Sequence, residues 1–239
     1  MALCCAAGWG NGCGAGPPAP SMEAMPDLGG PVFYLPGPFE AINTRRVGTG
    51  PAIEEFVEVS PEADGAWTVR FRRAGNDAAS VVGVRRLADG RPATEFLVDA
   101  QRNETAVFDP PLALVPRPGA ALPATESADV RLYDGVWTPE EARAREPSER
   151  GTAERRFRGI EQASWSAEDD PRPAWTLHHD LVLVLSPARV RQRYESTAVP
   201  RLGIVDESLA LRVSVFGVPV QRRREAVELT EIVVPRAEP

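Results

Sequence analysis

The expected fold is decided by the stretch from residue 173 to residue 220, PAWTLHHDLVLVLSPARVRQRYESTAVPRLGIVDESLALRVSVFGVPV. Three runs within it alternate apolar and polar residues, at 175–185, 190–194 and 209–216. A period of two is typical of a strand with one buried face. The Ser186-Pro187 break separates the first two runs. The stretch therefore predicts three strands that form the centre of a sheet.

The rest of the chain extends this pattern in both directions. Further strands are expected at residues 53–59, 67–72, 80–87, 94–99, 130–133, 155–166 and 222–234. Asp64-Gly65, Asp89-Gly90 and Asp134-Gly135 are hairpin signals between them. Thr138-Pro139-Glu140-Glu141 predicts a short helix that begins with a capping box and ends near Arg145. The predicted class is all-β and mostly antiparallel, as a curved sheet or two packed half-barrels with a short connecting helix.

Proline and glycine suggest how the chain is divided. Residues 1–38 are expected to be a signal-like segment and a Pro/Gly-rich linker, 39–127 an N-terminal β half and 128–239 a C-terminal β half. The two halves can also form one continuous domain. Residues 108–118 carry too many prolines for a central strand, so an extended edge segment or a crossover is expected there, followed by a linker at 119–127.

Composition excludes several classes of function. The net charge is −7 with a pI of about 5.1, which argues against a nucleic-acid partner. The cysteines are Cys4, Cys5 and Cys13, so no disulfide, thiol nucleophile or cysteine-based metal site is expected after residue 13. All 27 basic residues are arginine, and alanine, glycine and proline are abundant. This composition is typical of a GC-rich bacterial genome.

The N-terminal segment suggests export. Residues 1–13 are apolar and rich in small residues, but they lack a positively charged start and the apolar run is short. Cys13 precedes Gly14-Ala15-Gly16, as the acylated cysteine of a bacterial lipoprotein does, although Gly10 stands where leucine is usual. Cys13 is therefore a lipidation candidate that would tether the protein to a membrane. The alternative is an N-terminus with incidental cysteines.

Two segments resemble a known group of proteins. They are FDPPLALVP at 108–116 and VPRLGIV at 199–205. Both are similar to segments of the TapB-like bacterial envelope proteins, which are related in shape to the Lol lipoprotein carriers. This resemblance implies an exported or lipid-anchored protein with a curved antiparallel sheet. It implies no catalytic residue.

His178-His179-Asp180 is the sharpest cluster of candidate site residues. On a strand, His178 and Asp180 share one face, and the next strand can bring Glu195 near Asp180. These three side chains are a candidate metal site for a hydrolase, since a metal needs three or four converging ligands. The alternative is a polar sheet face with His179 as a hydrogen-bonded core residue. No cofactor is expected.

Other candidates have ordinary structural explanations. The carboxylate pair Asp206-Glu207 lies beside a turn, and Arg222-Arg223-Arg224 is followed by glutamates that would neutralise it on a mixed-charge strand. The rings of Trp67, Trp165 and Trp175 are expected in the core. If the sheet curves, part of its apolar face can line a groove for a lipid or peptide.

The sequence favours a non-enzymatic bacterial cell-envelope protein, located in the periplasm or outer envelope. Its expected role is to bind an apolar ligand on the concave face or to act as a structural partner of another envelope protein. The alternatives are a metal-dependent hydrolase that uses the His178 cluster, and a protein–protein interaction module that uses an exposed sheet edge.

Overall fold

Twelve β-strands and one short helix make up the described part of the computed structural model, which comprises residues 39–62, 66–75, 79–117, 119–167, 170–199 and 203–233. They are β1 (Phe39–Val47), β2 (Ala52–Pro61), β3 (Trp67–Arg73), β4 (Ala79–Arg86), β5 (Pro92–Asp99), β6 (Glu104–Ala113), β7 (Ala124–Asp134), α1 (Pro139–Arg143), β8 (Glu149–Ala167), β9 (Asp170–Leu185), β10 (Ala188–Val199), β11 (Gly203–Val215) and β12 (Val218–Val233). Cys13 and the Asp64-Gly65 signal lie outside the described residues. In the part that the structure describes, no helix is long and apolar enough to span a membrane.

The strands form one closed barrel. Each strand pairs antiparallel with its neighbours along the chain, and β1 pairs with both β2 and β12. Arg45, for example, lies opposite Ile53 on one side and Val227 on the other. The all-β, antiparallel prediction is confirmed. The boundary expected between residues 127 and 128 falls inside β7, whose hydrogen bonds to β6 and β8 join the two halves of the chain.

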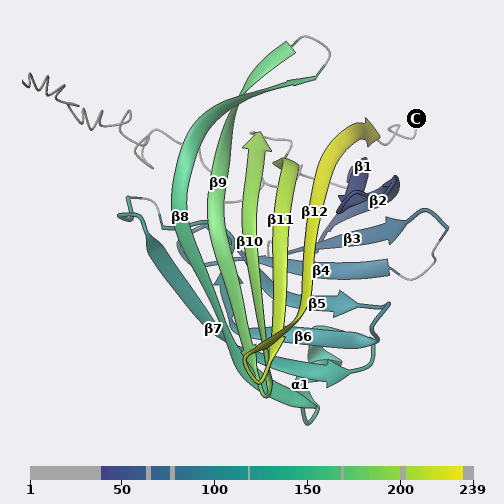
Figure 1. Ribbon diagram of the computed structural model, residues 1–239, viewed down its shortest axis with the longest axis vertical. Helices are drawn as coiled ribbons and strands as arrows, with labels where there is room; N and C mark the ends of the chain where they lie inside the picture. The colour runs from purple at the N-terminus through teal and green to yellow at the C-terminus, as the bar shows by residue number, and fades with distance from the viewer. Residues whose placement is uncertain are drawn as a thin grey trace, which may run out of the picture.

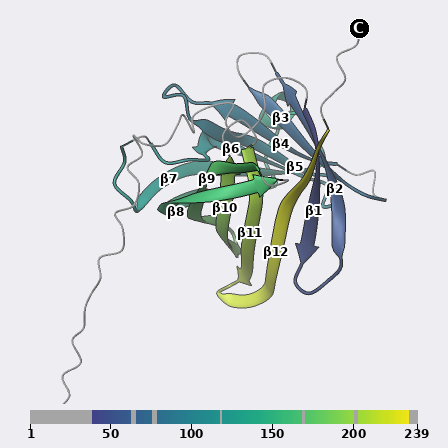
Figure 2. The same ribbon diagram turned by 90° about the horizontal axis from the view of Figure 1, so that it is seen from above.

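The two sides of the barrel differ in shape. Figure 1 shows β8 to β12 as long strands along one side, with β3 to β6 running across behind them. Figure 2 shows β1 and β2 beside β12, where the barrel closes. Separate apolar clusters pack each wall, around Val59 and Val69 on β2 and β3, and around Phe157 and Trp175 on β8 and β9. A cavity lies between these walls.

The alternating runs become strands with one inward face. On β9, Trp175, Leu177 and Leu181 are buried and point inward, whereas Val184 is exposed. The three runs of the opening stretch correspond to β9, β10 and β11. Their alternation predicted the strands because every second residue of a pleated strand lies on the same face.

One strand was missed and another is longer than predicted. No strand was expected at β1. β7 was predicted only at residues 130–133, but it begins at Ala124, inside the segment 119–127 that was interpreted as a linker. On β1, the inward residues are Ala41, Asn43 and Arg45. These residues are small or polar, so β1 lacks the apolar alternation that marks a strand in sequence.

The proline-rich segment is a distorted part of β6. Phe96 pairs with Val107 and Thr94 with Leu112, so residues 108–111 of β6 lie opposite Glu95 alone. Such a bulge accommodates proline, which has no N–H to donate to a neighbouring strand. The segment is thus neither an edge nor a crossover. No free edge exists among the described strands, because the barrel is closed.

The predicted helix is present as α1. Thr138 caps it, and Thr138 and Glu141 form both hydrogen bonds of the capping box. Ala142 is fully buried, against Tyr133 and Val107. The helix was expected to be a short connector. The buried Ala142, together with an ion pair between Arg143 and Glu95 of β5, fixes it to the barrel.

Candidate functional site

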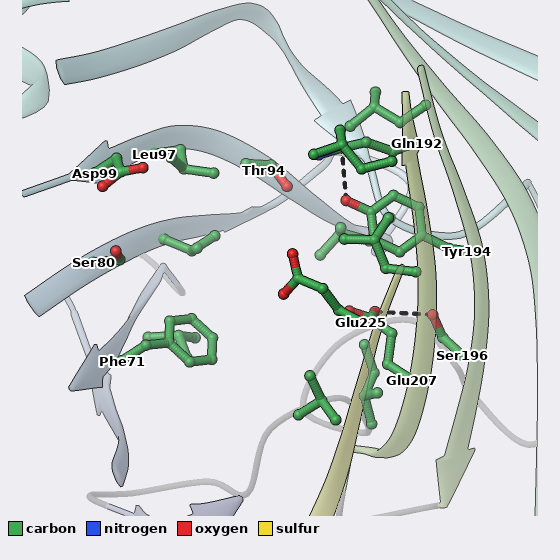
Figure 3. A pocket seen from close by; sticks show the side chains of 18 of the residues that line it. Phe71, Ser80, Thr94, Leu97, Asp99, Gln192, Tyr194, Ser196, Glu207 and Glu225 are labelled. Carbon is green, nitrogen blue, oxygen red and sulfur yellow. Dashed lines mark hydrogen bonds between the residues drawn. The ribbon is translucent and has the colours of Figure 1, made fainter. Parts of the chain in front are cut away.

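The barrel encloses a cavity of about 1010 Å³. Figure 3 shows Phe71, Ser80, Thr94 and Leu97 on one wall, facing Tyr194, Ser196, Glu207 and Glu225 on the other. The walls come from strands far apart in the sequence, so only the closed barrel creates this space.

Apolar side chains form most of the lining. They are the inward members of the alternating strands: Val57, Val59, Val69, Phe71 and Val82 from the shorter strands, and Trp175, Leu177, Leu181, Leu183, Leu185, Val190, Leu209, Leu211, Val213, Val227 and Leu229 from the longer ones. Water gains few hydrogen bonds on such a surface. The cavity therefore favours an apolar occupant.

A cluster of charged side chains lies on the inward face where β1 meets β2 and β12. Arg45 donates to both carboxylate oxygens of Glu55, with Nε–Oε1 at 3.0 Å and Nη2–Oε2 at 2.9 Å, and its Nη1 donates to Glu225 Oε2 at 2.6 Å. Glu55 and Glu225 are 3% and 8% exposed. Burial opposes the charge of Arg45, but hydrogen bonds and attraction from both glutamates raise its pKa above the ordinary value. The charges at this junction are thus paired.

Two more arginines complete the charged cluster. Arg223 Nη2 lies 2.6 Å from Glu225 Oε1, and Arg73 Nε lies 3.8 Å from Glu55 Oε1. These ion pairs connect β1 with β2, β3 and β12, the strands where the barrel closes. We infer that the charged cluster stabilises the closure and gives the apolar cavity one polar side.

A second polar group lies on β10 and β11. The Tyr194 hydroxyl donates to Gln192 Oε1 at 2.8 Å, and Ser196 Oγ donates to Glu207 Oε2 at 3.0 Å (Figure 3). Burial raises the pKa of the Glu207 carboxyl, with Arg45 and Arg155 opposing the shift. Glu207 therefore holds a proton more readily than an exposed glutamate does, and it can offer a hydrogen-bond donor or acceptor to the cavity.

His179 lies beside this second polar group. Its ring stacks on Tyr194 with centroids 4.7 Å apart and lies 6.0 Å from the ring of Phe157. Its Nδ1 is buried and has no hydrogen-bond partner among the described residues. Burial, together with nearby arginines, lowers its pKa to about 2. His179 is thus a neutral core residue, but the expectation that it is hydrogen bonded fails at Nδ1.

The predicted metal-binding residues are only partly brought together. Glu195 lies directly opposite His178, with Oε2 3.7 Å from Nδ1, and Glu161 Oε1 lies 3.4 Å from Nε2. Asp180 instead contacts three arginines, Arg158, Arg191 and Arg193, at 3.2 to 3.6 Å. In the described part of the chain, no three histidine, cysteine or acidic side chains are grouped as metal ligands. The geometry gives the hydrolase alternative no support.

The other sequence candidates divide between the two faces. Arg223 points inward to Glu225, whereas Arg222 and Arg224 are exposed. Trp67 and Trp175 are buried, as expected, and Trp165 is half-buried against an apolar cluster.

Sequence reasoning missed Arg45, Glu55 and Glu225 as a group. A signal for two of them existed, because Glu55 and Glu225 occupy the same alternating positions as Val57 and Val227.

The fold and site define a class: a closed twelve-stranded antiparallel barrel with a largely apolar internal cavity and two polar groups in its wall. No family model and no curated protein matches the chain. A crystal structure from Bacteroides fragilis, of a protein inferred to be exported and described as having a YmcC-like fold, aligns with a TM-score of 0.47 and 10% identity over 84% of this chain and 99% of that chain. A likeness this low carries no conclusion about function. The TapB-like resemblance remains a prediction.

Proposed function

We propose that this protein is an exported component of a bacterial cell envelope that binds an apolar or amphipathic small molecule inside the barrel. The observation that carries the proposal is the cavity of about 1010 Å³ with its largely apolar lining. Protein sites for small molecules are typically concave, largely apolar and about 300–1,000 Å³ in volume. The cavity is large enough for a molecule of lipid or drug size.

The energetics favour an occupant with a chain or ring system. Each methylene that moves from water into such a lining contributes about 0.8 kcal/mol. Tyr194, Glu207 and the charged cluster supply hydrogen-bonding groups inside the same space. An amphipathic molecule would place its polar group there and its apolar part against the leucines of β9 and β11.

Filling the cavity should weaken binding. We expect the purified protein to increase the fluorescence of N-phenyl-1-naphthylamine, an apolar probe. Leu209→Trp, which adds volume inside the barrel, should weaken probe binding about tenfold or more, equivalent to about 1.4 kcal/mol. Ser208→Trp places the same ring on the exposed face of the same strand and should bind as the wild type does. No probe binding by the wild type, or equal binding by Leu209→Trp, would contradict the proposal.

The location is part of the proposal and has its own test. The apolar, small-residue sequence at 1–13 and the lack of cysteine after Cys13 support an exported protein with a lipid at Cys13. We expect cell fractionation to place the protein in the membrane fraction, and the intact mass to show a diacylglyceryl group on a chain that begins at Cys13. Cys13→Ser should lose both properties. An unprocessed chain in the cytoplasm would refute the envelope location.

An edge-mediated interaction module has less support. Pairing with a partner strand requires a free sheet edge, and the described strands leave none.

A further inference from the structure

Five arginines gather on the outer face of β10, β11 and β12, although the protein as a whole has a net charge of −7. This arginine patch consists of Arg191, Arg193, Arg212, Arg222 and Arg224. All five side chains are exposed. They surround Ala210, whose small side chain helps to leave a shallow groove of about 370 Å³.

The strand register places like charges side by side. Arg212 lies directly opposite both Arg191 and Arg222, and Ala210 lies opposite both Arg193 and Arg224. Like charges at directly opposed positions destabilise a sheet. Asp180 contacts Arg191 and Arg193, whereas Arg212, Arg222 and Arg224 have no ion pair among the described residues. The stability of the fold does not explain why these arginines are adjacent. Binding of an anionic partner would explain it, because the partner would neutralise their charges.

Exposed apolar side chains lie next to the arginine patch, at the hairpin that joins β11 and β12. Phe216, Val218 and Val220 are 83%, 63% and 60% exposed. We call these three residues the apolar tip. The hairpin lies at the end of the long strands in Figure 1, next to the β9–β10 turn. Clustered exposed apolar residues beside a charged surface mark interaction sites.

The conformation of Phe216 is itself unfavourable. Phe216 and Gly217 are the central residues of a two-residue hairpin loop, and both have positive φ, at 49° and 81°. Such loops favour asparagine or aspartate followed by glycine, because bulky residues are strained at positive φ. The tip therefore presents an aromatic ring to solvent where asparagine would fit more easily. Stability does not explain this choice of residue.

We propose that the apolar tip and the arginine patch together dock the barrel onto the surface of an anionic lipid bilayer. Apolar side chains at an interface enter the boundary between headgroups and acyl chains, and arginines next to them bind lipid phosphates. A soluble polyanion would account for the arginines but not for the exposed tip. An apolar protein partner would account for the tip but not for five clustered cations. This site lies on the outside of the barrel and does not depend on the cavity.

Vesicle binding tests the proposal. The full chain carrying Cys13→Ser, which excludes a lipid anchor, should sediment with mixed phosphatidylglycerol–phosphatidylcholine vesicles and not with pure phosphatidylcholine vesicles. Binding should weaken at about 0.5 M salt, where the screening length is only a few ångströms. Equal binding to both kinds of vesicle, or to neither, would overturn the proposal.

A triple variant tests the arginine patch, and a matched control tests whether net charge alone explains the result. Arg212→Gln, Arg222→Gln and Arg224→Gln together should weaken binding about 100-fold, at about fivefold per arginine. The matched control replaces Arg70, Arg102 and Arg117 by glutamine. These arginines are exposed, lie on other parts of the barrel and carry the same total charge. An equal loss in the control would show an effect of net charge alone.

Phe216→Asn tests the tip without a risk to folding. The variant should lose about tenfold or more of its vesicle binding, while its melting temperature stays equal or rises, since asparagine suits the loop. If Phe216→Asn binds vesicles as the wild type does, and the patch binds inorganic polyphosphate as strongly as vesicles, the surface recognises a soluble polyanion and the membrane proposal fails.

Discussion

Replacing Arg45 with methionine is expected to lower the free energy of unfolding by about 3–5 kcal/mol, as the removal of one partner from a buried ion pair does. Arg45 joins Glu55 to Glu225, two carboxylates that are 3% and 8% exposed. Without it, Glu225 keeps Arg223 at 2.6 Å, whereas the remaining partner of Glu55, Arg73, lies 3.8 Å away. Urea denaturation followed by circular dichroism measures the change.

The matched controls identify the cause of the loss. Arg70→Met removes an exposed arginine with a long ion pair to Glu58, and should change stability by less than about 1 kcal/mol. Arg45→Met combined with Glu55→Gln should recover part of the loss, because Glu55 is the buried carboxylate whose remaining arginine, Arg73, lies 3.8 Å away. If Arg45→Met is no more destabilising than Arg70→Met, the charged cluster does not stabilise the barrel closure.

His179 is expected to make the protein sensitive to acid. Its pKa falls from an ordinary 6.5 to about 2 in the folded state, chiefly because it is buried. Below pH 6.5 the unfolded chain therefore binds a proton that the folded chain does not. The folded state loses about 1.4 kcal/mol of stability for each pH unit between 6.5 and the folded pKa. From pH 6.5 to pH 4.5 this amounts to roughly 3 kcal/mol.

Removing the histidine should remove this part of the pH dependence. We expect His179→Phe, which retains an aromatic ring against Tyr194, to lose about 3 kcal/mol less stability than the wild type over the same interval. Urea denaturation at a series of pH values gives both curves, and NMR of the His179 ring reports its protonation directly. Parallel curves, or a His179 signal that titrates near pH 6, would show that this histidine is not held neutral by the fold.

The sequence predicted the strands more reliably than the site. Alternation at residues 175–185 and 209–216 was sufficient to predict β9 and β11, because it reflects a local property of the backbone. β1 was missed because its inward residues are small or polar, and one of them, Arg45, belongs to the charged cluster. The polar residue that β1 contributes to the barrel closure therefore also interrupts the apolar alternation by which a strand is predicted.

The candidate metal site shows a second limit. Sequence reasoning correctly placed His178 and Glu195 on adjacent strands with one face in common, but it could not show which neighbours Asp180 would contact. Three arginines from β8 and β10 surround that carboxylate. Side-chain partners across strands depend on register, and register is set by the whole pairing pattern.

The sequence by itself determined an all-β chain, its short capped helix and which side chains share a face on the alternating strands. The tertiary structure alone decided that the sheet closes and encloses a cavity. Closure depends on pairing β1 with β12, and the Thr230 hydroxyl that donates to the Ile42 carbonyl there is 188 residues away along the chain. The alternation of apolar and polar residues reflects the local geometry of a strand, which is the same in an open sheet, a half-barrel and a closed barrel. Only the pairing of strands far apart in the sequence distinguishes these three architectures.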